Sequence, residues 1–152
     1  MTDNIYKLKI LNKLVKISNK RQNSFIKAAS NMRDARIKSL FYLKAKEVQM
    51  GLIELKKLII SLNGNDNYSI DIVEYSGRFW KSIINLMFGY NEIAIIDDIE
   101  DCELLAMNEY DKIVSLYLPP KVRILVLRLM SETQQNYDEI KAMSQSIKLM
   151  AN

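Results

Sequence analysis

The chain has 152 residues, the usual size of one domain and enough to bury a single sizeable core. It is 49% hydrophobic and 26% charged, yet it contains only four glycines and two prolines, which is few for a chain with many tight turns. The absence of histidine excludes Ser-His-Asp catalysis, Cys-His catalysis and His-containing zinc sites within one chain. The sequence therefore predicts one domain over residues 1–152, built from long helices.

The expected location follows from the cysteine content and the apolar runs. The single cysteine, Cys102, cannot form an intrachain disulfide. Lysines interrupt the apolar residues near the N-terminus, and no run approaches the roughly 18 residues of a membrane span. We therefore expect a cytoplasmic protein that neither spans nor binds a membrane.

The charge is unevenly distributed along the chain. The net charge is +4, but residues 1–38 carry +8 and the remainder carries −4. Eight acids and no Lys or Arg lie between Glu92 and Asp111. The basic first segment could bind nucleic acid or an anionic membrane, or it could be complemented within the fold. We favour complementation within the fold.

Apolar residues recur at helical spacing in five segments, taken in chain order. Four are long, at about residues 4–31, 35–63, 91–117 and 120–150, and a shorter one spans about 70–88. No alternation of strand length bounded by turn residues is present. The predicted fold class is all-α.

The boundaries of these segments have recognisable signals. Asp34 is suited to cap the second helix, and Asn91 is suited to cap the third. Gly64 can take the left-handed conformation that ends a helix. Pro120 is suited to the first turn of the fourth helix.

Four helices of this length would each span about 40 Å, which suits a four-helix bundle. The segment 64–90 is long enough to cross between the second and third long helices. Two hairpins joined by one long crossover form the ferritin-like topology, whereas an up-down-up-down bundle with a short inserted helix is the competing arrangement.

The third long helix places an acid where a core side chain belongs. Its predicted inward stripe is Ile96, Ile99, Glu103, Ala106, Tyr110, Ile113 and Tyr117. A buried carboxylate must be paired, bound to a metal or protonated. Glu103 is therefore the residue on which the function depends.

Polar residues on the other predicted stripes fall near the same level of the bundle. They are Ser18 and Gln22 on the first helix, and Thr133 and Asn136 on the fourth. With Glu103 and Tyr110 they could form either a buried site or a hydrogen-bonded layer that fixes helix register. We favour the layer, with Glu103 accepting a hydrogen bond from Tyr110, Gln22, Thr133 or Asn136.

Short motifs follow one another in a recognisable order over about residues 8–145. They are Phe25-Ile26-Lys27-Ala28-Ala29, Phe41 to Leu55, Leu62-Asn63-Gly64, Arg78-Phe79-Trp80, Glu100 and Glu103 followed by Tyr110, and Leu118-Pro119-Pro120-Lys121-Val122-Arg123. This order resembles a bacterial ferritin-like four-helix-bundle family of unknown function, related at fold level to rubrerythrins. The resemblance implies a ferritin-like bundle with a helix in the crossover.

The resemblance also implies a place for metal. Ferritin-like di-metal sites use inward carboxylates together with Glu-x-x-His pairs. Glu54, Glu100 and Glu103 stand where such carboxylates would lie, and the metal would be iron or manganese. Asn136 or Tyr137 stands where the family tends to show His, and amide oxygens are poor ligands for transition metals. We therefore expect no cofactor.

Three functions follow from these observations. The first, which we favour, is a non-enzymatic bundle that acts by association, as a homodimer or larger assembly. The second is an iron-handling or redox protein with a carboxylate-rich site centred on Glu103. The third is sequence-independent association of the basic first helix with nucleic acid.

Overall fold

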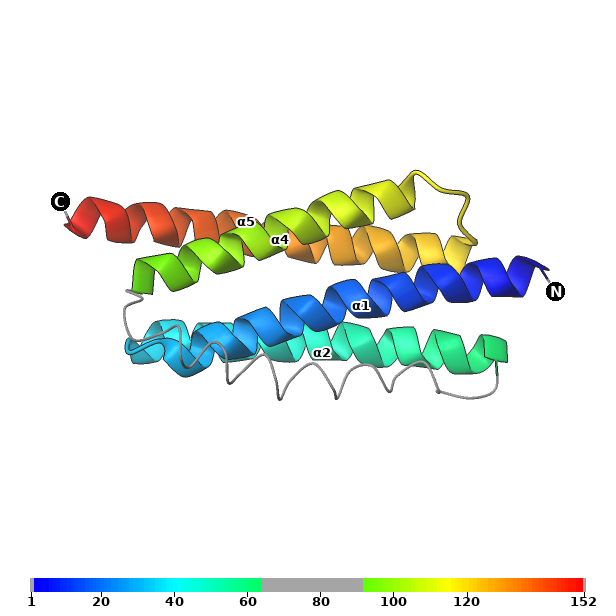
Figure 1. Cartoon of the computed structure of the whole chain (residues 1–152), viewed down its shortest axis with the longest axis horizontal. Coiled ribbons are helices and arrows are strands. Elements are labelled where there is room, and N and C mark those ends of the chain that lie inside the picture. Colours follow the sequence, from blue (N-terminus) through cyan, green and yellow to red (C-terminus); the bar gives the residue numbers. More distant parts are fainter. Residues whose placement is uncertain (1, 64–91, 152) are drawn as a thin grey trace.

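Four long helices make up the described part of the chain, residues 2–63 and 92–151, in a computed structural model. They are α1 (Thr2–Asn31), α2 (Ala35–Asn63), α4 (Glu92–Val114) and α5 (Pro120–Ala151), shown in Figure 1. The prediction of an all-α four-helix bundle is confirmed. The predicted crossover helix at 70–88, the Asn91 cap and the Gly64 terminus lie outside the described residues.

The end of α1 and the start of α2 are fixed by side chains. The Asp34 carboxylate accepts hydrogen bonds from the backbone N–H groups of Arg36, at 2.9 Å, and Ile37, at 3.3 Å. These are two of the otherwise unpaired donors of the first turn, so Asp34 is the N-cap. Glu92, at the start of α4, accepts from the backbone of Arg33 at 2.7 Å. The turn between α1 and α2 is thereby tied to the start of α4.

Helix α4 ends earlier than the sequence pattern indicates. Its last helical residue is Val114, and the Leu116 backbone N–H turns back to the Ile113 carbonyl at 3.0 Å. Tyr117 therefore lies outside the helix with 85% of its surface exposed, and its placement on the core stripe was wrong. The helical spacing continued through Tyr117, but the chain must turn before Pro120 to start α5.

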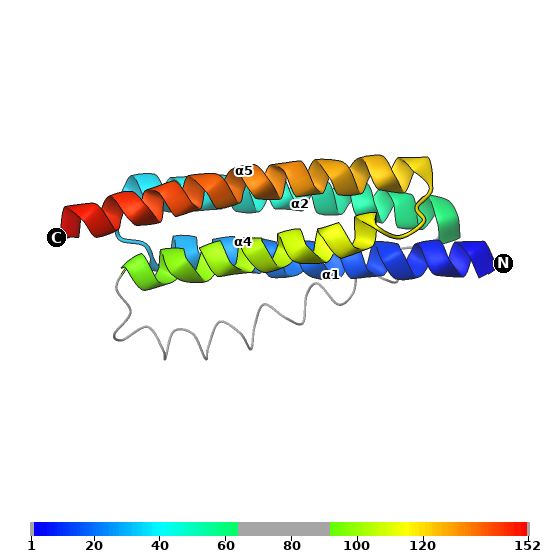
Figure 2. The same cartoon turned by 90° about the horizontal axis from the view of Figure 1, so that it is seen from above.

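The helices form two antiparallel hairpins, α1 with α2 and α4 with α5. In Figure 2, α1 and α4 lie in one layer and α2 and α5 in the other. Ion pairs Lys13–Glu109 and Arg21–Glu103 show that α1 and α4 run antiparallel. Consequently α2 and α4 run parallel, and Figure 1 shows α2 ending at the opposite end of the bundle from the start of α4.

The core divides into two apolar clusters along the bundle. One extends from the N-terminal half of α1 to the start of α5, and the other surrounds Phe25 and Phe41, whose ring centroids are 6.1 Å apart. Gly51 lets α2 approach α5 closely, because a Cβ there would lie 3.3 Å from Leu129 Cδ2. Buried polar side chains lie on the same helices as the two clusters, and they define the candidate site.

Candidate functional site

A buried ion pair joins α1 to α4 at the centre of the bundle. Arg21 Nε donates to Glu103 Oε1 at 2.9 Å, and Nη2 donates to Oε2 at 3.0 Å. Each side chain has only 1% of its surface exposed. Two parallel hydrogen bonds fix the geometry of both groups, and both carboxylate oxygens of Glu103 are already occupied.

Tyr110 and Ser18 complete this cluster. The Tyr110 hydroxyl lies 3.2 Å from Ser18 Oγ and accepts a longer bond of 3.4 Å from Arg21 Nη1. The Arg21 guanidinium also lies 6.0 Å from the centre of the Tyr110 ring, at the outer limit of a cation–π contact. The predicted direct bond from Tyr110 to Glu103 is replaced by contacts of Tyr110 with Ser18 and Arg21.

The electrostatics of the cluster favour the charged pair. Burial is the largest single influence on the Arg21 guanidinium and opposes its charge, but the charges of Glu103 and Tyr110 and the hydrogen bonds to them together outweigh burial and raise the pKa of Arg21 above its ordinary value. Among the described side chains, no buried nitrogen or oxygen lacks a hydrogen-bond partner. A fully paired cluster of this kind holds a unique helix arrangement rather than an open binding site.

Three residues of the predicted polar layer do not join the cluster. Gln22 is only half-buried. Thr133 is fully buried, but its hydroxyl donates to the Leu129 carbonyl of its own helix at 2.6 Å. Asn136 accepts from Lys44 Nζ at 2.8 Å. The predicted layer is thus split between the α1–α4 contact and the α2–α5 contact.

The α2–α5 contact contains a second buried cation. Lys44 is 4% exposed and donates both to Asn136 and, at 2.7 Å, to Glu139. The Glu139 side chain is 57% exposed, so this pair reaches the surface. A long lysine side chain can bury its stem while its ammonium reaches a partner at the rim.

A third polar contact lies between α4 and α5. Ser144 is buried, and its hydroxyl donates to Asp97 Oδ1 at 2.9 Å. Lys148 donates to the same oxygen at 3.2 Å from an exposed position. Asp97 thus pairs with two side chains of α5.

The proposed metal ligands do not come together. Glu54 points outward, with 48% of its side chain exposed, and pairs with Arg128. Glu100 is half-buried, and Glu103 is held by Arg21. Within residues 2–63 and 92–151, no group of three or more Cys, Asp or Glu side chains could hold a metal ion. A guanidinium beside the central carboxylate repels a cation, so these residues do not fit a di-metal centre.

The polar layer predicted from the sequence did not include Arg21 or Lys44, because Arg and Lys side chains are almost never fully buried unless they are paired. A signal was present in α1, where Leu14, Ser18, Arg21 and Phe25 also follow helical spacing. An inward acid on one helix requires a partner, and an arginine on a core stripe of another helix is the residue type that supplies one.

Cys102 lies beside the cluster and is mostly buried. Burial raises the pKa of the Cys102 thiol above its ordinary value, although a hydrogen bond from Ser24 and the charges of Arg21 and Lys20 act in the opposite direction. Basic neighbours are therefore present, but the effect of burial on the pKa is larger. A protonated thiol is a poor nucleophile.

Together these contacts define an all-α four-helix bundle whose central position holds a paired Arg and Glu. Residues 7–115 match the family described as domain of unknown function DUF2383, and the chain belongs to this family. No curated protein matches the chain at a significant level. None of the described helices is long and apolar enough to cross a membrane.

Proposed function

We propose that this protein is a non-catalytic helical bundle that acts by association with other protein, in the first place with its own copies. The supporting observation is the bidentate pairing of Arg21 with Glu103. This pairing occupies the carboxylate that a catalytic or metal-binding site would need. The two antiparallel hairpins, with α2 parallel to α4, also support a ferritin-like relationship. Two hairpins joined in this relative direction form the ferritin-like topology.

Light scattering coupled to size-exclusion chromatography tests this proposal. The expected result is a dimer or larger assembly whose population rises with protein concentration. A monomer at every accessible concentration would overturn association with its own copies. The protein is kept under reducing conditions during the measurement, so that an intermolecular disulfide through Cys102 cannot produce the assembly.

Metal analysis tests the iron or manganese alternative. Protein purified without chelator is compared with a Glu103→Gln variant after incubation with ferrous iron or manganese. We expect neither protein to hold stoichiometric metal, because the Arg21 charge lies against the only fully buried acid among the described residues. Stoichiometric metal in the wild type that is lost in the variant would support the metal reading instead.

A further inference from the structure

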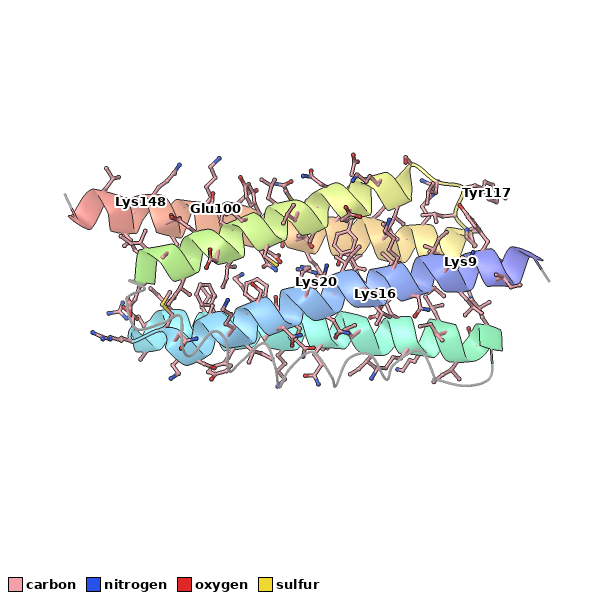
Figure 3. The ribbon with its side chains drawn as sticks, viewed as in Figure 1. Lys9, Lys16, Lys20, Glu100, Tyr117 and Lys148 are labelled. Carbon is pink, nitrogen blue, oxygen red and sulfur yellow. The ribbon has the colours of Figure 1, made fainter. Side chains whose placement is uncertain are left out.

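One side of the α1–α4 layer carries two adjacent ridges of opposite charge. The ridge on α1 consists of exposed Lys9, Lys13, Lys16 and Lys20, spaced by four, three and four residues. Figure 3 shows Lys9, Lys16 and Lys20 in a row along α1. This basic ridge follows most of the N-terminal two thirds of the helix.

The ridge on α4 is acidic around an exposed leucine. Asp98, Asp101 and Leu105 lie at positions i, i+3 and i+7 of one helix face, and Glu109 follows four residues later. Both aspartates are exposed, and Leu105 has 66% of its surface exposed. The acidic ridge therefore carries one exposed aliphatic side chain among its charges.

A shallow hollow of about 370 Å³ separates the two ridges. Its lining includes Lys16, Ile17 and Lys20 of α1 and Leu105 and Glu109 of α4. The two ridges therefore face the same side of the bundle.

The charges of the two ridges are largely unsatisfied within the described chain. Lys13 and Glu109 form an ion pair at 3.6 Å across the hollow. No ion pair in residues 2–63 or 92–151 involves Lys16, Lys20, Asp98 or Asp101. The expected complementation of the basic segment within the fold thus accounts for only part of the charge.

We propose that a second copy of this chain docks on the α1–α4 face, with the basic ridge of each copy on the acidic ridge of the other. This inference rests on the proposed function, since it names the surface through which the association occurs. A twofold axis parallel to the helices brings α1 of one copy over α4 of its partner copy, whereas an axis across the helices brings like charges together. Because Arg21 lies level with Glu103 within each copy, this axis brings Lys20 of one copy near the level of Asp101 of the partner copy. Charge complementarity therefore favours a second copy related by the axis parallel to the helices.

Two other surfaces are less informative. A long polyanion would meet Asp98 and Asp101 beside the lysines, so the ridge pair is less suited to nucleic acid than an all-basic face. On α2, an exposed apolar stripe contains Leu43, Met50, Ile53 and Ile60. Nothing in its charge pattern indicates what covers it.

Matched charge reversals test the docking. One variant carries Lys16→Glu with Lys20→Glu, and the other carries Asp98→Lys with Asp101→Lys. Each variant alone should have a dimer dissociation constant raised by about tenfold or more, because like charges then oppose each other. Mixing the two variants should restore a heterodimer, since both contacts become attractive again. Circular dichroism verifies that each variant is folded.

The control carries the same charge change on another face, as Lys46→Glu with Lys57→Glu on the exposed side of α2. We expect its dissociation constant to match that of the wild type.

The outcomes separate this inference from the proposed function. A wild type that assembles while both ridge variants assemble equally well would overturn the α1–α4 interface alone. A wild type that stays monomeric would overturn the proposed association itself. A monomer that binds duplex DNA at low salt, more tightly after Asp98→Lys with Asp101→Lys and without heterodimer formation on mixing, would replace docking by nucleic-acid binding.

Discussion

At the scale of single residues, the central ion pair decides what the bundle interior can do. Arg21 and Glu103 are both 1% exposed and hold each other with two hydrogen bonds. Burial of two charges contributes little net stability when both are present, but removing one leaves the other uncompensated. We therefore expect single variants of the pair to lose more free energy of unfolding than additivity with the double variant would give.

The first prediction concerns Glu103→Gln. We expect a loss of about 3 to 5 kcal/mol in the free energy of unfolding, because the Arg21 charge stays buried without a counter-charge. Urea denaturation measures it. The double variant Arg21→Met with Glu103→Leu should lose less than the sum of the single variants. Glu100→Gln, which removes a half-buried acid from the same helix, is the control. Equal losses at positions 100 and 103 would contradict a special role for the pair.

The second prediction concerns the thiol of Cys102. Because burial raises its pKa in the folded state, the native thiol stays protonated at pH values where the unfolded chain ionises, above about 8.5. The contribution of this group to stability is therefore full below that pH and is lost as the pH rises through the raised native pKa. Alkylation by iodoacetamide near pH 8 should be much slower in native protein than in urea. Equal rates would show that the thiol is accessible and ionised.

At the scale of elements, side chains at the helix ends determine where each helix begins. The third prediction is that Asp34→Ala costs about 0.5 to 2 kcal/mol in the free energy of unfolding, because two backbone donors of α2 lose their acceptor. Asp34→Asn keeps a side-chain acceptor and should cost much less. Thermal and urea unfolding of both variants make the comparison. If Asn proved as costly as Ala, the capping role would be wrong.

The helices themselves could be predicted from the sequence because their apolar spacing persists over about six turns or more. In α2 the inward residues at helical spacing are all buried or half-buried; they are Ile37, Phe41, Ala45, Val48, Leu52, Leu55, Ile59 and Leu62. The end of α4 could not be predicted in the same way, because the spacing continues to Tyr117 while the chain turns at Ser115. Where the apolar spacing continues past the point at which the chain must turn, the connection to the next helix determines where the helix ends.

The site was predictable only in part. The inward position of Glu103 follows from the spacing on its own helix, but the identity of its partner depends on how α1 rotates against α4. A rotation by one residue exchanges Gln22 for Arg21 at the interface. Likewise, the outward position of Glu54 depends on the rotation of α2 against α5. Periodicity defines a face to within about one residue, which is too coarse to assign a hydrogen-bond partner.

At the scale of the whole molecule, polar contacts connect the two hairpins. Arg21–Glu103 joins α1 to α4, Lys44–Asn136 joins α2 to α5, and both lie between buried apolar side chains. The fourth prediction is that the two hairpins unfold as one cooperative unit. Amide hydrogen exchange should give similar opening free energies for the central turns of α1 and α4. Independent exchange of the hairpins, with α4 opening at much lower free energy, would contradict this coupling.

The buried pair also fixes the axial register of α1 against α4. Sliding α1 by one turn against α4 moves the guanidinium about 5.4 Å and places it against apolar side chains, so the shifted alignments are penalised more strongly than the native one is stabilised. Either partner alone is harmful in such an interior, whereas an apolar pair of matching volume is acceptable. We therefore expect positions 21 and 103 to vary together among relatives, as Arg with Glu or as two apolar residues, and to avoid every intermediate with a single charge.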